Sequence, residues 1–374
     1  MKKFNLFIYL SLSIMVLSGS SYSQSIKLFA GTGAKAGEKG LYLFDLDTEK
    51  GAFKLLSETD AGPNPSYFCI SEKNGLIYAA NEVMNFNGLH GGGVTALRYT
   101  DKTKAVEKIK ELAVPDGAPC FISLSPGNDF LFMANYTGGS IAVIKLDEKG
   151  IPVSLTDTIL YGSEGEKVSH AHMIASDPKG KRVYLTDLGL DRIVIYNFDT
   201  TTGRLKQIQN GIFKFAAGTG PRHFVFNPDC TKMYVIGELN STVSVLDVDA
   251  NGELKLIQTI TTLKKGYTGQ NACADLHLGK SGDFLYGSNR GENNIVTFKI
   301  GTGGTLTLAG HSSCGGDWPR NFVIDPSGKN LVTGNQKSGN ISLFRIDMKS
   351  GIPAESGVEY KIPSPECLKF YGAK

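Results

Sequence analysis

Apolar and polar residues alternate along this chain in a pattern that repeats about every fifty residues. Each repeat holds short runs of β-forming residues, separated by turn sequences such as Asp177-Pro-Lys-Gly180 and Asp325-Pro-Ser-Gly328. Alternation with a period of two, broken by Gly, Pro and Asp, is typical of half-buried strands. Self-similarity at this period is typical of propellers, so we predict an all-β fold, a β-propeller with four-stranded blades.

One position, directly ahead of the first apolar run of each repeat, fixes the phase of the pattern. This phase marker recurs at intervals of 54, 52, 50, 52, 46 and 46 residues. The markers are Pro65, Pro119, Ala171, Pro221, Cys273, Pro319 and Pro365. In the first six repeats a second apolar run ends sixteen residues after the marker. We therefore expect the two runs to be neighbouring strands of one blade.

The two ends of the chain each hold part of a repeat. Residues 365–371 supply only a first strand, whereas residues 27–32 and 40–47 have the pattern of a second and a third strand. Joining these pieces makes a seventh blade from both termini, which covers the apolar faces that an open ring would expose. The continuous repeat predicts a single domain over residues 24–374.

The first two dozen residues have a different pattern. A basic start at Lys2 and Lys3 precedes an apolar stretch over residues 4–17, and small residues follow at Ser21 and Ser23. This arrangement is typical of a secretion signal. The apolar stretch is short for a membrane span. We predict a signal peptide over residues 1–23 and a periplasmic or secreted mature protein, with an uncleaved anchor as the alternative.

Charge and cysteine content narrow the classes of partner. The chain has 39 basic and 36 acidic residues spread along its length, for a net charge of +3. Nucleic-acid binding would need clustered basic residues, so we expect no such partner, no membrane partner after signal cleavage, and a monomer.

Six cysteines could form disulfides after export, but burial at strand starts is the preferred interpretation for Cys69, Cys120, Cys273 and Cys367. Their spacing matches no metal site, and we predict neither metal nor cofactor.

The repeat predicts which side chains meet at one end of the ring. Neighbouring strands are antiparallel, so the start of each first strand and the end of each second strand lie at one mouth of the central channel. His172, Arg222, Glu238, Arg290 and Arg320 collect there, with His170 and His223 nearby. Because arginine grips carboxylate or phosphate groups with a planar fork, we expect an anionic ligand. His172 or Glu238 is the candidate general acid or base.

Other residues near this mouth have less specific interpretations. A predicted substrate-binding set consists of His170, His223, Arg320, Asn289, Asn335 and Tyr136. His170 and His172 could together bind a metal ion, but two histidines alone are a weak signal. Asp275 and His277, deeper along an inner strand, are expected to form a hydrogen-bond network that locks the blades.

Three pairs of motifs carry a resemblance to a known family. They are Gly220-Pro-Arg-His223 with Glu238-Leu-Asn-Ser241, Ala274-Asp-Leu-His277 with Ser288-Asn-Arg290, and Pro319-Arg-Asn-Phe322 with Asn335-Gln-Lys-Ser338. In this order and spacing they resemble the seven-bladed lactonase family, which includes the propeller-type 6-phosphogluconolactonases and a fungal carboxy-muconate lactonizing enzyme. The resemblance covers residues 27–370.

The resemblance implies an active site made of His172, Arg222, Glu238 and Arg290. By analogy, Glu238 or His172 would activate water for attack on a lactone carbonyl. Arg222 and Arg290 would hold an anionic group of the substrate or stabilise the developing oxyanion. The expected function is hydrolysis of a sugar lactone, as in the 6-phosphogluconolactonases. A non-catalytic secreted propeller and a muconate-type cycloisomerase are the alternatives.

Overall fold

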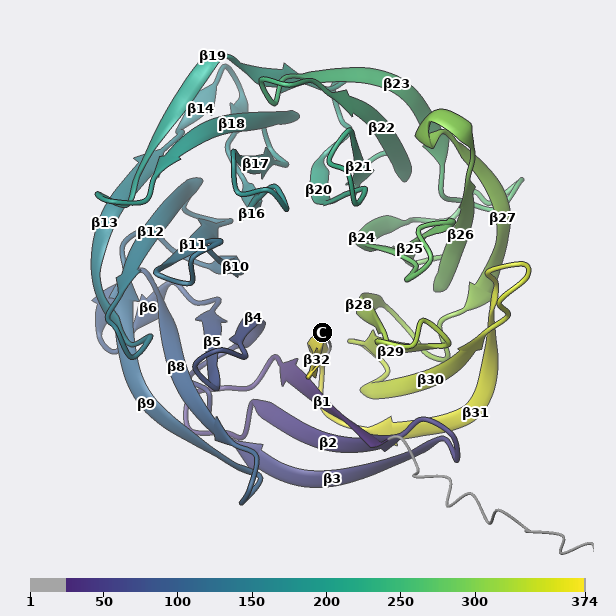
Figure 1. Cartoon of the computed structure of the whole chain (residues 1–374), viewed down its shortest axis with the longest axis horizontal. Helices are drawn as coiled ribbons and strands as arrows, with labels where there is room; N and C mark the ends of the chain where they lie inside the picture. Colours follow the sequence, from purple (N-terminus) through teal and green to yellow (C-terminus); the bar gives the residue numbers. More distant parts are fainter. Residues whose placement is uncertain (1–24, 373–374) are drawn as a thin grey trace, which may run out of the picture.

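A computed structural model describes residues 25–372 of the chain. These residues form seven four-stranded antiparallel sheets around a central axis, which confirms the predicted propeller (Figure 1). The signal-peptide prediction falls on residues 1–23 and lies outside the described part. Among residues 25–372 there is no helix of the length and apolar character needed to cross a membrane.

The blade that closes the ring is built from both ends of the described chain, as predicted. β32 (Pro365–Tyr371) is its innermost strand, followed outward by β1 (Ser25–Thr32), β2 (Leu41–Asp47) and β3 (Ala52–Thr59). β32 and β1 pair antiparallel. Figure 1 shows the yellow C-terminal strand beside the purple N-terminal ones. The outermost strand, β3, is a third contribution from the N-terminal segment.

The other six blades run outward from the axis in chain order (Figure 1). Blade by blade, their strands are β4 (Pro65–Ser71), β5 (Leu76–Asn81), β8 (Gly92–Thr100), β9 (Ala105–Val114); β10 (Pro119–Leu124), β11 (Phe130–Asn135), β12 (Ser140–Leu146), β13 (Pro152–Leu160); β16 (Ala171–Ser176), β17 (Val183–Asp187), β18 (Arg192–Asp199), β19 (Arg204–Lys214); β20 (Pro221–Phe226), β21 (Lys232–Gly237), β22 (Thr242–Val248), β23 (Leu254–Thr261); β24 (Ala272–Leu278), β25 (Phe284–Arg290), β26 (Asn294–Ile300), β27 (Leu306–Ser313); and β28 (Pro319–Ile324), β29 (Asn330–Asn335), β30 (Asn340–Ile346), β31 (Pro353–Lys361). A short 3-10 turn, η1 (Thr302–Gly304), precedes β27.

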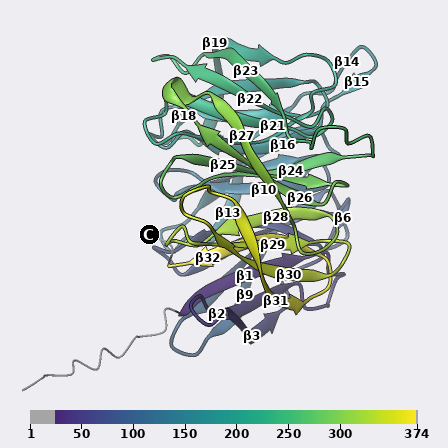
Figure 2. The same ribbon diagram turned by 90° about the vertical axis from the view of Figure 1, so that its right-hand side faces the viewer.

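Two short hairpins interrupt the regular blades and are not predicted by the repeat. β6 (Asn85–Phe86) pairs with β7 (Leu89–His90), and β14 (Ser163–Glu164) pairs with β15 (Lys167–Val168). Both project from the side of the ring that lies opposite the C-terminus (Figure 2). They lie at the end of the ring where the inner strands begin.

The turns between strands have the chemistry that their sequences predict. In the turn after β28, Asp325 Oδ1 accepts hydrogen bonds from the backbone N–H groups of Lys329 and Asn330, at 3.0 Å each. Gly328 has φ +74°, a left-handed conformation that costs glycine little. Asp177 binds its own turn in the same way.

Adjacent blades are joined by a repeated tyrosine hydrogen bond as well as by apolar packing. A buried tyrosine in the second strand of one blade donates to the carbonyl of a glycine in the outer turn of the next. The pairs are Tyr78 with Gly150 (2.7 Å), Tyr184 with Gly252 (3.0 Å), Tyr234 with Gly304 (3.0 Å) and Tyr286 with Gly351 (2.8 Å). All four glycines have positive φ, between 75° and 87°. These bonds hold neighbouring blades at a fixed spacing.

The six cysteines are free thiols within the described residues. Cys120, Cys273, Cys314 and Cys367 are buried, whereas Cys69 and Cys230 are partly buried. The interpretation of the strand-start cysteines as packing residues is therefore confirmed for Cys120, Cys273 and Cys367, and Cys69 follows it in part.

Candidate active site

The register of the inner hairpins brings the predicted site residues to one end of the ring. In six blades the phase marker lies directly opposite the residue sixteen positions later. The pairs are Pro65 with Asn81, Pro119 with Asn135, Ala171 with Asp187, Pro221 with Gly237, Cys273 with Asn289 and Pro319 with Asn335. The residues that follow each member of a pair therefore meet at the same channel mouth.

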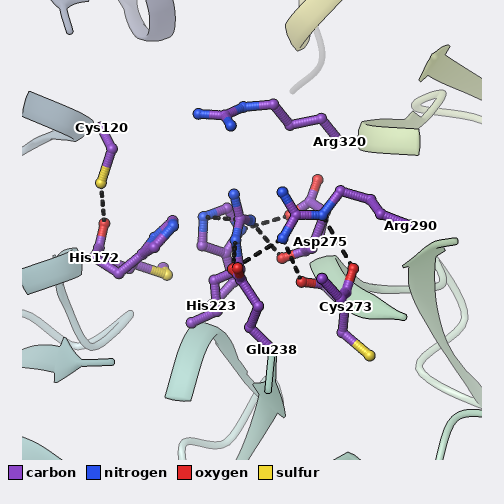
Figure 3. Close-up of polar contacts among 12 residues, drawn as sticks. Cys120, His172, His223, Glu238, Cys273, Asp275, Arg290 and Arg320 are labelled. Carbon is purple, nitrogen blue, oxygen red and sulfur yellow. Dashed lines mark hydrogen bonds and ion pairs between the residues drawn. The ribbon is translucent and has the colours of Figure 1, made fainter. Parts of the chain in front are cut away.

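A β-bulge follows the marker in all seven inner strands. The strand gains one residue relative to its neighbour, directly after the marker in five blades and within the three residues after it in β20 and β24. The residues directly after the markers are Ser66, Cys120, His172, Arg222, Ala274, Arg320 and Glu366. A bulge re-aims a side chain that regular pleating would direct elsewhere. His172 and Arg320 accordingly extend toward the middle of the cluster from different blades (Figure 3).

Glu238 lies between two arginines at the centre of this cluster. Its Oε2 atom is 2.8 Å from Arg222 Nε and 2.9 Å from Arg290 Nη2. The Arg222 N–H is not aimed at the carboxylate, so that contact is an ion pair without a linear hydrogen bond. Both arginines are almost fully buried, whereas the Glu238 side chain keeps 18% of its surface exposed. Part of the Glu238 side chain is thus accessible to a ligand.

The same two arginines are anchored to the backbone at the start of β24. Arg222 Nη1 donates to the carbonyl of Ala274 at 2.6 Å. Arg290 donates from Nε to Ala272 O at 3.0 Å and from Nη2 to Cys273 O at 3.1 Å. These bonds fix both guanidinium planes before any ligand arrives.

Mutual burial of these charges shifts their proton affinities. Burial alone would raise the pKa of Glu238, but Arg290, Arg222 and Arg320 together outweigh burial and lower it. The pKa of Arg290 falls to about 10, because burial and the neighbouring Arg222 disfavour its charge more than Glu238 favours it. At neutral pH, Glu238 is therefore ionised and held by positive charges.

Two buried histidines complete the inner side of the cluster. The ring of His172 lies 5.2 Å from that of His223 and 5.7 Å from that of Tyr136. Burial, followed by the charge of Arg222, lowers the pKa of His172 well below its usual range and that of His223 to about 4. Both imidazoles are neutral at pH 7. His172 Nδ1 is buried and has no hydrogen-bond partner among the described residues.

His223 belongs to the blade-locking network rather than to the exposed surface of the site. Its Nδ1 atom lies 2.8 Å from Asp275 Oδ1, and His277 Nε2 lies 2.8 Å from Asp275 Oδ2. Asn321 also donates to Asp275 and accepts the backbone N–H of Leu368 at 2.7 Å. The predicted network of Asp275 and His277 is confirmed, and it joins the inner strands β20, β24, β28 and β32.

Arg320 is clamped between two carboxylates that the sequence interpretation did not assign to the site. Its Nη2 atom lies 3.1 Å from Glu82 Oε2, and its Nε atom lies 3.3 Å from Glu366 Oε2. Burial opposes the charge of Arg320, but the two carboxylates outweigh it and raise its pKa. Gln336 Nε2 donates to Glu366 Oε1 at 2.9 Å. The marker phase alone could have identified Glu82 and Glu366, since both occupy mouth positions.

Two of the predicted substrate-binding residues form the rim beside His172. The rings of Tyr136 and His170 are stacked with centroids 4.5 Å apart, and His170 Nδ1 lies 3.1 Å from Tyr136 O. Both side chains are half-buried. Burial and the charge of Glu238 raise the pKa of Tyr136, so its hydroxyl stays protonated and able to donate a hydrogen bond.

The predicted substrate-binding role of Asn289 and Asn335 must be corrected. Both residues are fully buried. Asn289 Nδ2 donates to Thr262 O at 2.9 Å and to Asn294 Oδ1 at 2.8 Å, and Asn335 Nδ2 donates to Cys314 O at 3.0 Å. Both lie opposite a marker, and their side-chain amides bind backbone carbonyls of the loop that leads into the blade. They lie one position short of the mouth.

Trp318 is a further site neighbour that the sequence interpretation missed. Its ring lies 5.5 Å from the guanidinium carbon of Arg290, and Lys337 Nζ lies 3.2 Å from the ring centroid. Trp318 directly precedes the marker Pro319 and has φ +67°. Several of the residues that precede the marker in other blades also have a positive φ. A large aromatic residue directly ahead of a marker is the signal that could have identified it.

Comparison with known proteins places this geometry in a family. Residues 27–370 match the family described as "Lactonase, 7-bladed beta-propeller". The chain belongs to this lactonase family. The matched range includes all the site residues described above, and the family name supports a lactonase activity.

Relatives across the family cover nearly the whole chain. The 6-phosphogluconolactonase of Bacillus subtilis is 30% identical over 351 residues, which covers 91% of this chain and 97% of the relative. The 6-phosphogluconolactonase of Formosa agariphila is 32% identical over 322 residues, covering 83% and 90%. The solved structure of the periplasmic gluconolactonase of Pseudomonas aeruginosa has a TM-score of 0.86 at 26% identity, covering 94% of this chain and all of that one.

Proposed function

We propose that this family member hydrolyses a sugar lactone at the cluster of Glu238, Arg222 and Arg290. The observation that carries the proposal is the partly exposed side chain of Glu238, whose carboxylate is held between two buried arginines from different blades. Packing alone rarely requires such an arrangement, because removing charged groups from water is costly even when they are paired. Relatives named 6-phosphogluconolactonase and gluconolactonase support the choice of a sugar lactone.

In the proposed reaction, Arg222 and Arg290 bind the carbonyl oxygen of the lactone. Water attacks the ester carbon, and the carbonyl oxygen becomes an oxyanion that the two guanidinium groups stabilise. The bond between the carbonyl carbon and the ring oxygen then breaks, and the departing alkoxide takes up the proton that the attacking water gave to Glu238. Fixed backbone anchors at β24 keep both arginines in place, so little reorganisation is needed as charge develops.

Glu238 is the proposed base that accepts a proton from the attacking water, with His172 as its partner in proton transfer. In the free protein both are unprotonated at neutral pH, but the arginines make Glu238 a weak base. The negative charge that develops on the oxyanion beside Glu238 would raise the proton affinity of this carboxylate. Charge development and proton uptake would therefore favour each other.

Two alternatives use the same surface differently. A non-catalytic propeller would bind a ligand or protein at this mouth, and convergence of arginines on a carboxylate with an orphaned imidazole beside it favours an enzyme over that alternative. Cycloisomerisation of a muconate-like acid would use the same side chains. The relatives named 6-phosphogluconolactonase and gluconolactonase favour hydrolysis over this reaction.

We also propose that the enzyme acts outside the cytoplasm. Support comes from the basic, apolar and small-residue order of residues 1–23 and from the periplasmic relative of Pseudomonas aeruginosa. N-terminal sequencing of the protein from its native host should find a start near Gln24 in an extracytoplasmic fraction. An intact Met1 in a cytosolic fraction would overturn this proposal.

The function is tested by assaying purified mature protein against a panel of aldonolactones. Each hydrolysis releases a proton at neutral pH, so a weakly buffered indicator assay follows every substrate in the same way, after subtraction of spontaneous hydrolysis. At least one lactone should be hydrolysed with a kcat/KM above about 10⁴ M⁻¹ s⁻¹, the lower part of the usual enzyme range. Absence of activity on every member, with binding of lactones retained, would favour the non-catalytic propeller.

A further inference from the structure

The charges at the channel mouth are balanced. Three arginines, Arg222, Arg290 and Arg320, face three carboxylates, Glu238, Glu82 and Glu366, and every arginine contacts at least one of the carboxylates within 3.3 Å. The sequence interpretation expected an anionic ligand because it counted the arginines. It did not include Glu82 and Glu366, which the bulge of β32 and the end of β5 bring against Arg320.

The two buried histidines do not add positive charge at the mouth. His172 and His223 are neutral at pH 7, because burial and nearby Arg222 lower their pKa values. Deeper in the ring, the cation Lys369, whose Nζ donates to Tyr67 OH at 3.1 Å, lies among groups that include the ionised Asp275. Arg222, Arg290, Arg320 and Lys369 thus each have an acidic counterpart among the described residues.

A phosphoryl group would meet carboxylates at this mouth as well as arginines. A phosphate monoester carries about 1.5 to 2 negative charges at pH 7. To bind Arg320, it would have to displace Glu82 or Glu366, which would leave a carboxylate of low exposure without its cation. Hydroxyl groups face no such penalty, because they donate hydrogen bonds to carboxylates and to the Gln336 side-chain oxygen.

If the protein hydrolyses a sugar lactone as proposed, these contacts also indicate which class of lactone the mouth binds. We infer that the substrate is an uncharged aldonolactone, whose hydroxyl groups bind the carboxylate side of the mouth, and not a phosphorylated lactone. Negative charge then develops only at the carbonyl oxygen during the reaction, where Arg222 and Arg290 are placed to meet it. The polar groups facing the sugar hydroxyls are Glu82, Glu366 and Gln336.

The test compares D-glucono-1,5-lactone with its 6-phosphate, using the full-length mature protein and one proton-release assay. Because like charges placed together are strongly disfavoured, kcat/KM for the uncharged lactone should exceed that for the phosphate by about tenfold or more. A higher kcat/KM for the phosphate would overturn the inference and leave lactone hydrolysis standing. No hydrolysis of either lactone, or of the aldonolactone panel, would instead count against the proposed function.

Two variants test whether the carboxylates at the mouth cause the preference for the uncharged lactone. Glu82→Gln removes one partner of Arg320 and leaves positive charge in excess, so the ratio of the two kcat/KM values should move toward the phosphate by about tenfold. Glu82→Ala guards against an effect specific to the new amide and should move the ratio the same way. An unchanged ratio in both variants would contradict the inference.

The matched control is Lys337→Ala, at an exposed lysine whose ammonium lies over Trp318. This lysine is the rim cation through which a phosphate could still be recognised beside Arg290. The inference requires the ratio of the two kcat/KM values to stay within about twofold, since surface charges act weakly through solvent. A selective loss of activity on the phosphorylated lactone would reveal a phosphate site at the rim and overturn the inference.

Discussion

At the scale of single residues, the site depends on guanidinium groups that are fixed at several points. Arg222 contacts Glu238 through Nε and donates to Ala274 O through Nη1, and Arg290 contacts the same carboxylate and two backbone carbonyls. A lysine has the charge of an arginine but not its planar fork of donors. The geometry of donors, more than the charge, therefore distinguishes this site.

Arg222→Lys is expected to keep the fold and to lose much of the activity. A single ammonium nitrogen cannot occupy the separate positions of Arg222 Nε beside Glu238 and Arg222 Nη1 at the Ala274 carbonyl, and removal of one oxyanion donor typically lowers the rate by about a hundredfold. Steady-state kinetics on the best lactone should show this loss mainly in kcat. Full activity in the lysine variant would assign Arg222 a purely electrostatic role, and circular dichroism provides the control for folding.

The buried histidines and acids also predict how folding stability depends on pH. The pKa of His223 is about 4 in the folded protein and that of His172 is also lowered, so the unfolded chain binds protons at these sites first. Stability should therefore fall as pH drops from about 7 through 6.5 toward 4. Glu238 and Asp275, whose pKa values are lowered in the folded state, add a further loss below about pH 4.5.

Urea denaturation from pH 8 to pH 4 measures this dependence. Asn replaces His223 in the control variant, because an amide keeps a hydrogen-bond donor to Asp275 and removes the titration. The His223→Asn variant should be less stable than the parent at pH 8, with a shallower decline between pH 7 and pH 5. An equal decline in both proteins would show that His223 is not a source of the pH dependence.

At the scale of elements, the bulge after each phase marker is the feature that turns a packing repeat into a site. It was not predicted, because a single extra residue changes the backbone path without changing the repeat length. The phase itself was predictable, and it placed His172, Arg222, Glu238, Arg290 and Arg320 at one end of the ring. Asn289 and Asn335 show the limit of that reasoning. They are buried structural residues, although each is only one position along its strand from a residue at the mouth.

The tyrosine links between blades give a prediction at this same scale. Tyr286→Phe removes the hydroxyl that donates to Gly351 and leaves a carbonyl without its partner, so the free energy of unfolding should fall by about 1–2 kcal/mol. Tyr267→Phe is the matched control, because its hydroxyl binds Gln270 within one surface turn. Its effect should stay within about 0.5 kcal/mol. Equal effects in the two variants would mean that the inter-blade bonds add little.

At the scale of the whole molecule, ring closure depends on the last strand. β32 buries Leu368 completely and Phe370 to all but 9% of its surface, and Asn321 receives the Leu368 N–H within the network of Asp275. This closure was predictable from the unequal remnants at the two ends. The network that extends across four inner strands was not, because its members lie far apart in sequence and only the ring brings them together.

Deletion of residues 365–374 should prevent stable folding. Loss of Leu368 and Phe370 alone removes about 1.5–3 kcal/mol of burial each, against a net stability of about 5–15 kcal/mol for a typical domain. The deletion also exposes the edge of β1. Soluble expression and thermal unfolding should show aggregation or a Tm lowered by many degrees, whereas removal of residues 373 and 374 alone leaves β32 intact. A deletion variant that kept the parent's Tm would refute closure by β32.

The central claim, lactone hydrolysis with Glu238 as the base, is tested most directly by the kinetics of Glu238→Gln. Glutamine keeps the size of the side chain but cannot accept the proton, so kcat on the best lactone should fall by about a hundredfold or more in a variant that circular dichroism shows to be folded at the assay temperature. Retention of full activity in the folded variant would contradict the claim, and Glu238 would then be a structural partner of Arg222 and Arg290.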